Sequence, residues 1–390
     1  MSGPGPGIAS VAEAELGALA ERDLAAWPGM PARLLHVLAP ELGIDVEVAA
    51  GDADVATREP LRPGARFRIA SFTKTFVGVA ALRLVEDGAL RLDAPLDDLL
   101  SPETLAALRD GGYDTGAIVL RHLLTHTSGI YDFAASAYDP SITDGFDDAV
   151  ARDPLHRWTR LEQIRFAMTH GRPYGAPGTV FGYSDTGACL VGEILEERTG
   201  RTMGGAIREL VGFERLGLRH TWHETVELAP SDLPQLSHQY EGEVDIAGID
   251  PSVDLWGGGG LMSTCRDLSR FLRALLRGEV FHDPATLGEM TTLLEGVPAA
   301  EAMAVGDDPS DAGMFIFRAE AGGETWWGHD GWWGTTAYAC PRLDLTVVAG
   351  HQQAKMPKGF TRTGILGDVL GILAADDAGP ADRLPRLDAS

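Results

Sequence analysis

Lysines, cysteines and long apolar runs are all scarce in this chain of 390 residues. Lysine occurs only at Lys74, Lys355 and Lys358, so nearly all of the positive charge is arginine and a well-placed lysine is informative. The three cysteines are far apart and odd in number, which favours reduced, packed thiols over a disulfide framework or a zinc site. The longest clearly apolar run, around residues 76–85, is broken by Arg83 and is too short to span a bilayer.

Positive charge is also scarce relative to negative charge. Lys and Arg number 32 against 57 Asp and Glu, which gives a formal net charge of −25. An acidic surface repels phosphate backbones and anionic lipid, so we expect neither nucleic acid nor a membrane as a partner. The first ten residues, MSGPGPGIAS, have no basic segment followed by an apolar one. No secretory signal is therefore predicted, and a cytoplasmic protein is expected.

The order of the predicted elements favours an α+β fold. Apolar spacing predicts helices over residues 11–24, 73–86, 188–197, 267–277 and 361–373. Strands are predicted over residues 44–49, 67–70, 314–318, 324–327, 334–339 and 345–348, and a turn over 51–54. The last four strands are joined by short turns, as in an antiparallel meander. We therefore expect an antiparallel sheet flanked by helices, with a mostly helical region inserted in it.

This pattern predicts a single domain over residues 1–375. Its α/β part would comprise residues from about 11–95 and 255–375, with the helical insert at about 96–254. The polar, proline-containing residues 376–390 are predicted to form a loose tail. The length alone gives ample material for a core.

A serine three residues before the first lysine is the first candidate for chemistry. Ser71 and Lys74 lie where a predicted strand passes into a predicted helix, and a spacing of three places both side chains on one helix face. A serine hydroxyl is a weak nucleophile until a base lies within hydrogen-bond reach. The start of a helix also directs backbone N–H groups at a developing oxyanion. The competing interpretation is a serine helix cap beside a solvated lysine, and on this motif alone the two are equally favoured.

Two further short motifs are weak on their own. In Tyr183-Ser184-Asp185, the phenol could relay protons if Lys74 as a cation lowered its pKa, although a tyrosine in a turn is usually just packed. In His329-Asp330-Gly331, the glycine would let a substrate approach the strand edge, and the residue after it would offer a main-chain N–H.

In combination and in this order, the three motifs resemble the serine β-lactamase and penicillin-binding-protein superfamily. The segments 122–129 (HLLTHTSG) and 258–268 (GGLMSTCRDL with its preceding glycine) are also similar to segments of this family. The similarity covers residues of about 40–370. The branch it resembles most is the class C β-lactamase-like group, which includes family VIII esterases, D-amino-acid peptidases and acyltransferases of secondary metabolism.

The resemblance implies a role for each motif. Ser71 would be the acylated nucleophile, and Lys74 and Tyr183 would share the general-base and general-acid work. The main-chain N–H groups of Ser71 and Trp332 would form the oxyanion hole, and His329 would assist Tyr183 and substrate binding. We expect no cofactor and no metal in this chemistry.

Two departures from the family pattern bear on the substrate. Members that hydrolyse β-lactams carry K-T-G, whose lysine attracts a carboxylate, whereas this chain has His329 and Asp330. A neutral imidazole beside a carboxylate should bind an anion poorly, which argues against a true β-lactamase. Asp185 replaces the usual asparagine, and an ionised carboxylate cannot donate a hydrogen bond. We hypothesise that Asp185 pairs with Lys74 and holds it protonated, which would make Tyr183 the base.

Tryptophans and histidines supply weaker hints. Of the tryptophans near the third motif and the glycine run at 257–260, we expect Trp333 and Trp256 to line an apolar wall for the substrate. Asp330, Gly331 and Asp185 are also expected to bind the substrate. Core packing is the alternative for each tryptophan. The histidine pairs 122/126 and 220/223 lack the nearby carboxylate or cysteine set of a zinc site, so no metal is expected.

Three functions remain open from the sequence. The first is a hydrolase that cleaves an ester or amide through an acyl-enzyme. The second is a transacylase, in which an amine or alcohol acceptor replaces water. The third is a binding protein that has lost activity, although the intact Ser71, Lys74 and Tyr183 argue against it. The partners expected are a small-molecule acyl donor and, for a transacylase, an acceptor. The oligomeric state is left open.

Overall fold

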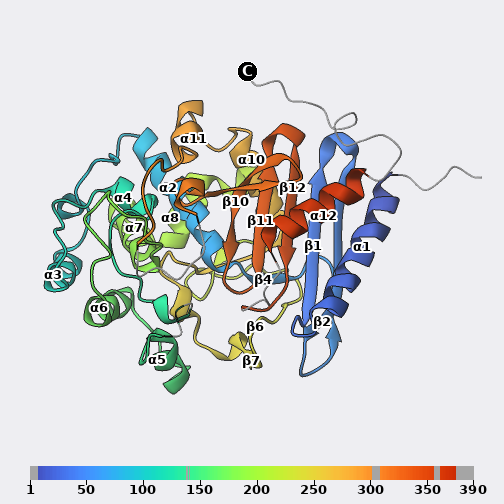
Figure 1. Cartoon of the computed structure of the whole chain (residues 1–390), viewed down its shortest axis with the longest axis horizontal. Helices are drawn as coiled ribbons and strands as arrows, with labels where there is room; N and C mark the ends of the chain where they lie inside the picture. Colours follow the sequence, from blue (N-terminus) through green and yellow to red (C-terminus); the bar gives the residue numbers. More distant parts are fainter. Residues whose placement is uncertain (1–7, 138, 140, 301–307, 355–360, 375–390) are drawn as a thin grey trace, which may run out of the picture.

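A computed structural model describes residues 8–137, 139, 141–300, 308–354 and 361–374. At its centre lies a seven-stranded sheet in which every neighbouring pair is antiparallel, with the order β3-β2-β1-β12-β11-β10-β9 (Figure 1). The strands are β1 Ala32–Ala39, β2 Ile44–Asp54, β3 Glu59–Pro60, β9 Phe317–Ala321, β10 Glu324–Gly331, β11 Thr335–Cys340 and β12 Leu345–Gly350.

Helices cover both faces of this sheet. Helices α1 (Ile8–Ala26) and α12 (Arg362–Ala374) pack on one face, where they enclose one apolar cluster with β1, β2 and β12. Helices α2 (Thr73–Glu86) and α10 (Cys265–Leu276) lie on the other face. Almost every side chain of α2 is buried, from Thr73 to Leu84, as expected for a helix enclosed on all sides. The start of α2 is therefore held rigidly at the centre of the molecule.

The rest of the chain forms a mostly helical layer beside α2 and two small sheets (Figure 1). The helices are α3 Pro102–Asp110, α4 Leu120–Leu124, α5 Phe146–Arg152, α6 Arg160–His170, α7 Asp185–Thr199, α8 Met203–Val211, α9 Phe213–Leu216 and α11 Pro284–Met290. The strands are β4 Arg66–Arg68, β5 Trp222–His223, β6 Tyr240–Glu241, β7 Val244–Asp245 and β8 Leu261–Thr264. Short 3₁₀ turns are η1 Pro40–Leu42, η2 Ala70–Phe72, η3 Leu96–Asp98, η4 Ala135–Ala137, η5 Ile246–Gly248, η6 Pro251–Asp254, η7 Pro309–Asp311 and η8 Pro341–Leu343.

The predicted antiparallel α+β architecture is confirmed, but several elements differ from the prediction. Strand β1 was not predicted, because its eight residues are apolar almost without interruption and lack the alternation of a half-buried strand. The predicted turn at 51–54 is wrong, since β2 runs on to Asp54. The predicted strand at 67–70 is also partly wrong, because β4 ends at Arg68 and Ala70 begins η2. Strand β9 begins three residues later than predicted.

The remaining predictions have mixed outcomes. Helix α7 begins at Asp185 rather than at residue 188, which places that carboxylate at the helix start. The predicted insert, residues 96–254, contains α3 to α9 and only the short strands β5 to β7. The predicted tail at 376–390 lies outside the described residues. None of the described helices has both the length and the apolar content of a membrane-spanning segment.

Candidate active site

Ser71 lies in η2, the single turn between strand β4 and helix α2. The residue before it, Ala70, has φ of 46° and is 1% exposed. A non-glycine residue adopts this left-handed conformation only when its surroundings hold it there. Here the turn packs against Trp333 and Ile246. The fixed backbone conformation of Ala70 therefore sets the direction in which the Ser71 side chain leaves the turn.

Lys74 lies one helical turn beyond Ser71, and its Nζ atom lies 2.8 Å from Ser71 Oγ. The same nitrogen donates to the carbonyl oxygen of Gly258 at 2.7 Å and forms an ion pair with Asp185 Oδ1. An ammonium group has three N–H donors, and these acceptors leave none of the three unsatisfied. The lysine side chain is fully buried, so solvent does not compete for these contacts.

The Lys74–Asp185 pair determines the charge at the candidate nucleophile. Burial alone would lower the pKa of Lys74, but the negative charges of Asp185 and the neighbouring Asp254 raise that pKa above its ordinary value. Lys74 is therefore an ammonium in the resting protein. Asp185 is the first residue of α7, where the helix dipole favours a carboxylate, and the Ser184 hydroxyl caps the same helix by accepting from Gly187 N.

Tyr183 joins the same group from a distant stretch of the chain. Its hydroxyl forms side-chain hydrogen bonds with both Lys74 and Ser71, and Lys74 Nζ lies 4.9 Å from the centre of its ring. Lys74 lowers the pKa of Tyr183, as the sequence predicts, but a net fall in that pKa does not occur in the resting protein. Burial raises the pKa of this phenol above its ordinary value and outweighs the lysine charge. Tyr183 is therefore a neutral phenol.

His126 also supports the site, although sequence reasoning assigned it no role. Its ring stacks on Tyr183 with centroids 4.4 Å apart, and its Nδ1 accepts a hydrogen bond from Ser184 N. Burial and the Lys74 charge keep its pKa well below the ordinary value, so it is neutral. Its φ of 55° lies in the left-handed region. The signal that could have identified it is its place in the HLLTHTSG segment, next to residues that are themselves buried.

His329 is near the end of strand β10 and lines the cavity in front of Ser71. Burial and the charge of Lys74 lower its pKa to about 3, so the ring is neutral. Its Nδ1 is hydrogen-bonded to the carbonyl oxygen of Asp330. Because a carbonyl oxygen only accepts, the proton is on Nδ1 and Nε2 carries a lone pair. Nε2 is buried and has no hydrogen-bond partner among the described residues.

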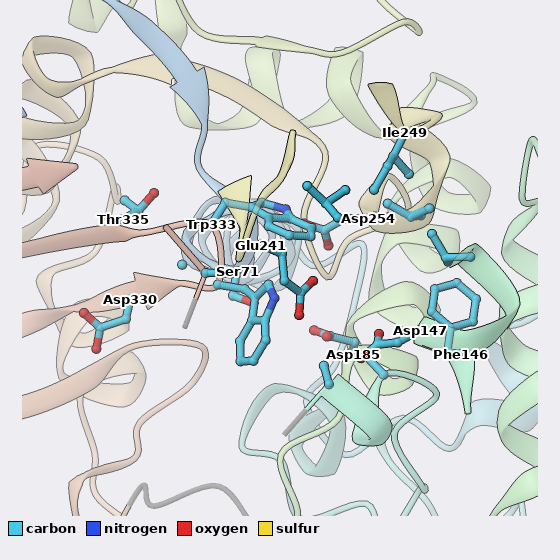
Figure 2. Close-up of a pocket in the computed structure, with 18 of the residues that line it drawn as sticks. Ser71, Phe146, Asp147, Asp185, Glu241, Ile249, Asp254, Asp330, Trp333 and Thr335 are labelled. Carbon is cyan, nitrogen blue, oxygen red and sulfur yellow. The ribbon is translucent and has the colours of Figure 1, made fainter. Parts of the chain in front are cut away.

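Asp330 is among the residues that line the cavity, but its carboxylate is held by other side chains. Successive strand residues point to opposite faces, so its carboxylate points away from Ser71 (Figure 2). It accepts from Arg362 Nη1 of α12 at 2.8 Å and from the Tyr338 hydroxyl at 3.3 Å. Gly331 lines the cavity, and packing gives a further reason for glycine here, since a Cβ would lie 2.4 Å from the carbonyl oxygen of Ile69. This contact places the end of β10 directly against the turn that carries Ser71.

A cavity of about 950 Å³ opens in front of Ser71 (Figure 2). Apolar side chains form much of its wall, among them Phe133, Phe146, Val150, Ile249, Trp332 and Trp333. Six acidic residues also line it, namely Asp147, Asp148, Asp185, Glu241, Asp254 and Asp330. The described lining contains one arginine, Arg362, which is paired with Asp330.

The two tryptophans singled out from the sequence lie in different places. Trp333 lines the cavity, as does Trp332. Trp256, by contrast, is not among the residues that line the cavity, so its prediction is wrong. Its Nε1 donates to the carbonyl oxygen of Trp158, and Arg160 lies over its ring at 5.2 Å.

The glycine run 257–260 forms the wall behind Lys74. A Cβ on Gly258 would lie 3.0 Å from Asp185 Oδ1, and a Cβ on Gly259 would lie 2.1 Å from Asp254 Oδ2. Each of these glycines therefore leaves room for one carboxyl group. The sequence analysis assigned no role to Asp254, because an acidic residue in a predicted loop is usually exposed to solvent. Burial and the charge of Asp185 raise its pKa to about 7, and Trp333 donates a side-chain hydrogen bond to it.

No group of three or more His, Cys, Asp or Glu side chains in the described part of the chain is arranged to hold a metal ion. In the histidine pairs, His122 Nδ1 accepts from Val119 N and His223 is hydrogen-bonded to the carbonyl oxygen of Leu255. Both contacts are structural.

Comparison with known proteins assigns the family. Residues 43–368 match the family model described as Beta-lactamase. The chain belongs to the beta-lactamase family. The resemblance that the three motifs predicted is thus confirmed.

Several members of the beta-lactamase family have names that indicate hydrolysis. Esterase EstB of Burkholderia gladioli is 29% identical over 335 residues, which is 77% of this chain and 80% of EstB. A D-aminopeptidase of Gluconobacter oxydans is 28% identical over 223 residues, but these cover only 37% of that longer protein. Among solved structures, a D-stereospecific amidohydrolase from Streptomyces sp. has a TM-score of 0.72 at 25% identity and covers 93% of this chain and 99% of its own. A penicillin-binding protein homologue from Pyrococcus abyssi, at 22% identity and a TM-score of 0.71, shares the fold.

Proposed function

We propose that this member of the beta-lactamase family is a serine hydrolase that cleaves an ester or amide through an acyl-enzyme on Ser71. One observation carries the proposal: Lys74 Nζ lies 2.8 Å from Ser71 Oγ at the edge of a cavity that can hold a substrate. The names of related proteins, an esterase, a D-aminopeptidase and an amidohydrolase, support ester or amide hydrolysis.

The first step needs a base, and the resting charges indicate where the serine proton goes. Lys74 is an ammonium and Tyr183 a neutral phenol, so neither can accept a proton directly. The nearest carboxylate is Asp185, in contact with Lys74. As Ser71 Oγ bonds to the substrate carbonyl carbon, its proton passes to Lys74 Nζ while Lys74 gives one proton to Asp185. The carbonyl electrons move to the oxygen, which becomes the oxyanion.

Collapse of the tetrahedral intermediate then breaks the bond to the leaving group. The Tyr183 hydroxyl protonates the departing oxygen or nitrogen, and Tyr183 recovers its proton from Asp185 through Lys74. The serine proton thus ends on the leaving group, and all three side chains return to their resting charge. In the second step, water attacks the acyl carbon and its proton passes along the same relay to Asp185. Collapse of this intermediate breaks the bond to Ser71 Oγ, which regains a proton from the relay, and the acid is released. The hydrogen bonds of Tyr183 to both Ser71 and Lys74 support this relay.

The oxyanion would accept hydrogen bonds from the main-chain N–H groups of Ser71 and Trp332. Two features support this assignment. Ser71 immediately precedes helix α2, whose N-terminus carries partial positive charge. Gly331 packs against the carbonyl of Ile69, so the residue that follows it lies beside the same turn.

Acyl transfer to an amine or alcohol is the second candidate. A cavity of about 950 Å³ with two tryptophans in its wall has room for an acceptor beside an acyl group, and this volume favours the candidate. Transfer would use the same acyl-enzyme, with the acceptor in place of water in the second step. A binding protein without activity is the third possibility, and the contact between Ser71 and Lys74 argues against it.

Two measurements test these alternatives in turn. Labelling by a fluorophosphonate, compared between the native protein and Ser71→Ala, separates an active serine from an inactive site. Labelling of the native protein alone is expected, and equal labelling of both would remove the basis of the proposal. Product analysis with a nitrophenyl ester, with and without added amine, then separates hydrolysis from transfer, because a transacylase forms the amide faster than Ser71→Ala does, whereas a hydrolase leaves only the uncatalysed amide background.

A further inference from the structure

Asp254 lies at the cavity wall, and no cationic side chain of the described residues is paired with its carboxylate. Among the described residues it forms no ion pair, and its side-chain hydrogen bond comes from the indole of Trp333. The cations that act on it are engaged elsewhere. Lys74 is paired with Asp185, and Arg68 forms two hydrogen bonds to Glu224, at 2.7 and 3.2 Å.

The chain makes specific room for this carboxyl group. The three atoms nearest to a Cβ on Gly259 all belong to the Asp254 carboxyl, at 2.1 to 2.4 Å. Any larger residue at position 259 would displace the carboxyl group from Trp333. Figure 2 shows Asp254 beside the Trp333 indole and facing the space in front of Ser71.

A second observation concerns His329, on a different part of the wall. Its Nε2 is a buried lone pair with no partner among the described residues, on a side chain that is only 4% exposed. A lone pair of this kind accepts N–H or O–H donors from a ligand and cannot pair with a carboxylate. Both observations describe acceptors on a cavity wall whose one described arginine, Arg362, is already paired with Asp330.

We propose that the substrate carries an ammonium group, which binds beside Asp254 and the indole of Trp333. This inference rests on the proposed function and names its substrate class. A carboxylate attracts the cation and an indole face stabilises it further. Glu241, Asp147 and Asp185 line the same space and add negative charge (Figure 2).

The subsite has a defined pH dependence. The charged groups that act on Asp254 are Asp185, which raises its pKa, and Lys74 and Arg68, which lower it. With a pKa of about 7, Asp254 is mostly neutral at pH 6 and mostly ionised at pH 8. An ammonium binds the ionised form better, so preference for a cationic substrate increases as the pH rises through 7.

Matched nitrophenyl esters test this. The 3-aminopropanoyl ester, whose amine stays protonated at pH 8, is compared with the butanoyl ester, in which a methyl group replaces the ammonium. We expect kcat/KM for the cationic ester to exceed that of its isostere by about 10- to 100-fold at pH 8, as for one charge-assisted hydrogen bond. The ratio of the two kcat/KM values should fall at pH 6.

A second experiment asks whether the ammonium belongs to the acyl acceptor instead. It uses an uncharged ester as acyl donor and compares ethanolamine with 1-propanol as acceptors.

Two variants complete the experiment. Asp254→Asn should reduce the ratio by about tenfold and remove its pH dependence. A purely structural defect would lower both rates alike. Glu243→Gln removes an equal charge from the exposed turn next to Glu241 and should leave the ratio unchanged. If the uncharged ester is cleaved as well as the cationic one, and propanol competes as well as ethanolamine, the inference is wrong. Ser71-dependent cleavage of the uncharged ester would still uphold the proposed function.

Discussion

The carboxylate of Asp185 is ion-paired with Lys74, whose Nζ atom also contacts Ser71 Oγ. The pair places a proton acceptor one transfer away from the candidate nucleophile. Asparagine at position 185 would provide a hydrogen-bond partner for the lysine but no base. The distinctive chemistry of this site therefore depends on the single change from amide to carboxylate.

Asp185→Asn tests this dependence through the pH–rate profile. Without the carboxylate, the main cause that raises the pKa of Lys74 is absent, while burial continues to lower it. Lys74 must then lose its proton to solvent before it can act as a base. We expect kcat/KM for an uncharged ester to gain a new limb that rises with pH. A profile identical to that of the native protein would falsify the proton relay.

Lys74→Met should destabilise the protein. Removing one partner leaves the mostly buried carboxylate of Asp185 without its counter-ion, which costs about 3 kcal/mol. The measurement is urea unfolding at pH 7.

The double variant Lys74→Met/Asp185→Asn serves as the control. It removes both charges and should recover most of the lost free energy of unfolding. Equal stability losses in the single and the double variant would show that the ion pair does not account for the effect.

Gly259→Ala should destabilise the protein by crowding Asp254. The backbone at position 259 has ordinary φ, so the cost arises from the contact with the carboxyl group and should be about 1–3 kcal/mol. Adding Asp254→Ala removes the crowding atoms and should restore stability. Gly288→Ala, where nothing lies within 4 Å of a new Cβ, is the matched control and should not destabilise. Failure of the double variant to recover would place the strain elsewhere.

The cavity histidine His351 should contribute to acid sensitivity. Burial lowers its folded-state pKa to about 3, with Arg33 adding to the effect, whereas the unfolded value is about 6.5. The unfolded chain therefore binds a proton that the folded chain does not, and stability is lost as the pH falls from about 6.5 towards 3. His351→Gln should reduce the slope of unfolding free energy against pH by about 1.4 kcal/mol per unit in this window. Parallel slopes for the two proteins would contradict the assignment.

Local spacing explains which parts of the site could be predicted. Ser71 and Lys74 are one helical turn apart, so a correctly predicted helix start was sufficient to bring them together. Tyr183 and His329 come from distant elements, and only the resemblance to a family linked them to Ser71. The same alternation that places His329 in the cavity directs Asp330 to the opposite face, and this could have been recognised from the strand pattern.

Tertiary context explains what was missed. Asp254 is the last residue of the 3₁₀ turn η6, and its proximity to Gly259 and Trp333 depends on how distant strands meet. His126 depends on the ring of Tyr183, which stacks on it across the fold. The raised pKa of Tyr183 was missed because burial, which outweighs the nearby cation, cannot be derived from spacing alone.

Intact-mass spectrometry after brief incubation with an activated ester tests the central claim most directly. The account predicts a mass increase equal to one acyl group, located on the peptide that contains Ser71, and no such adduct on Ser71→Ala, which should also lose turnover. Turnover by Ser71→Ala at the native rate, or an acyl group found only on another residue, would contradict it.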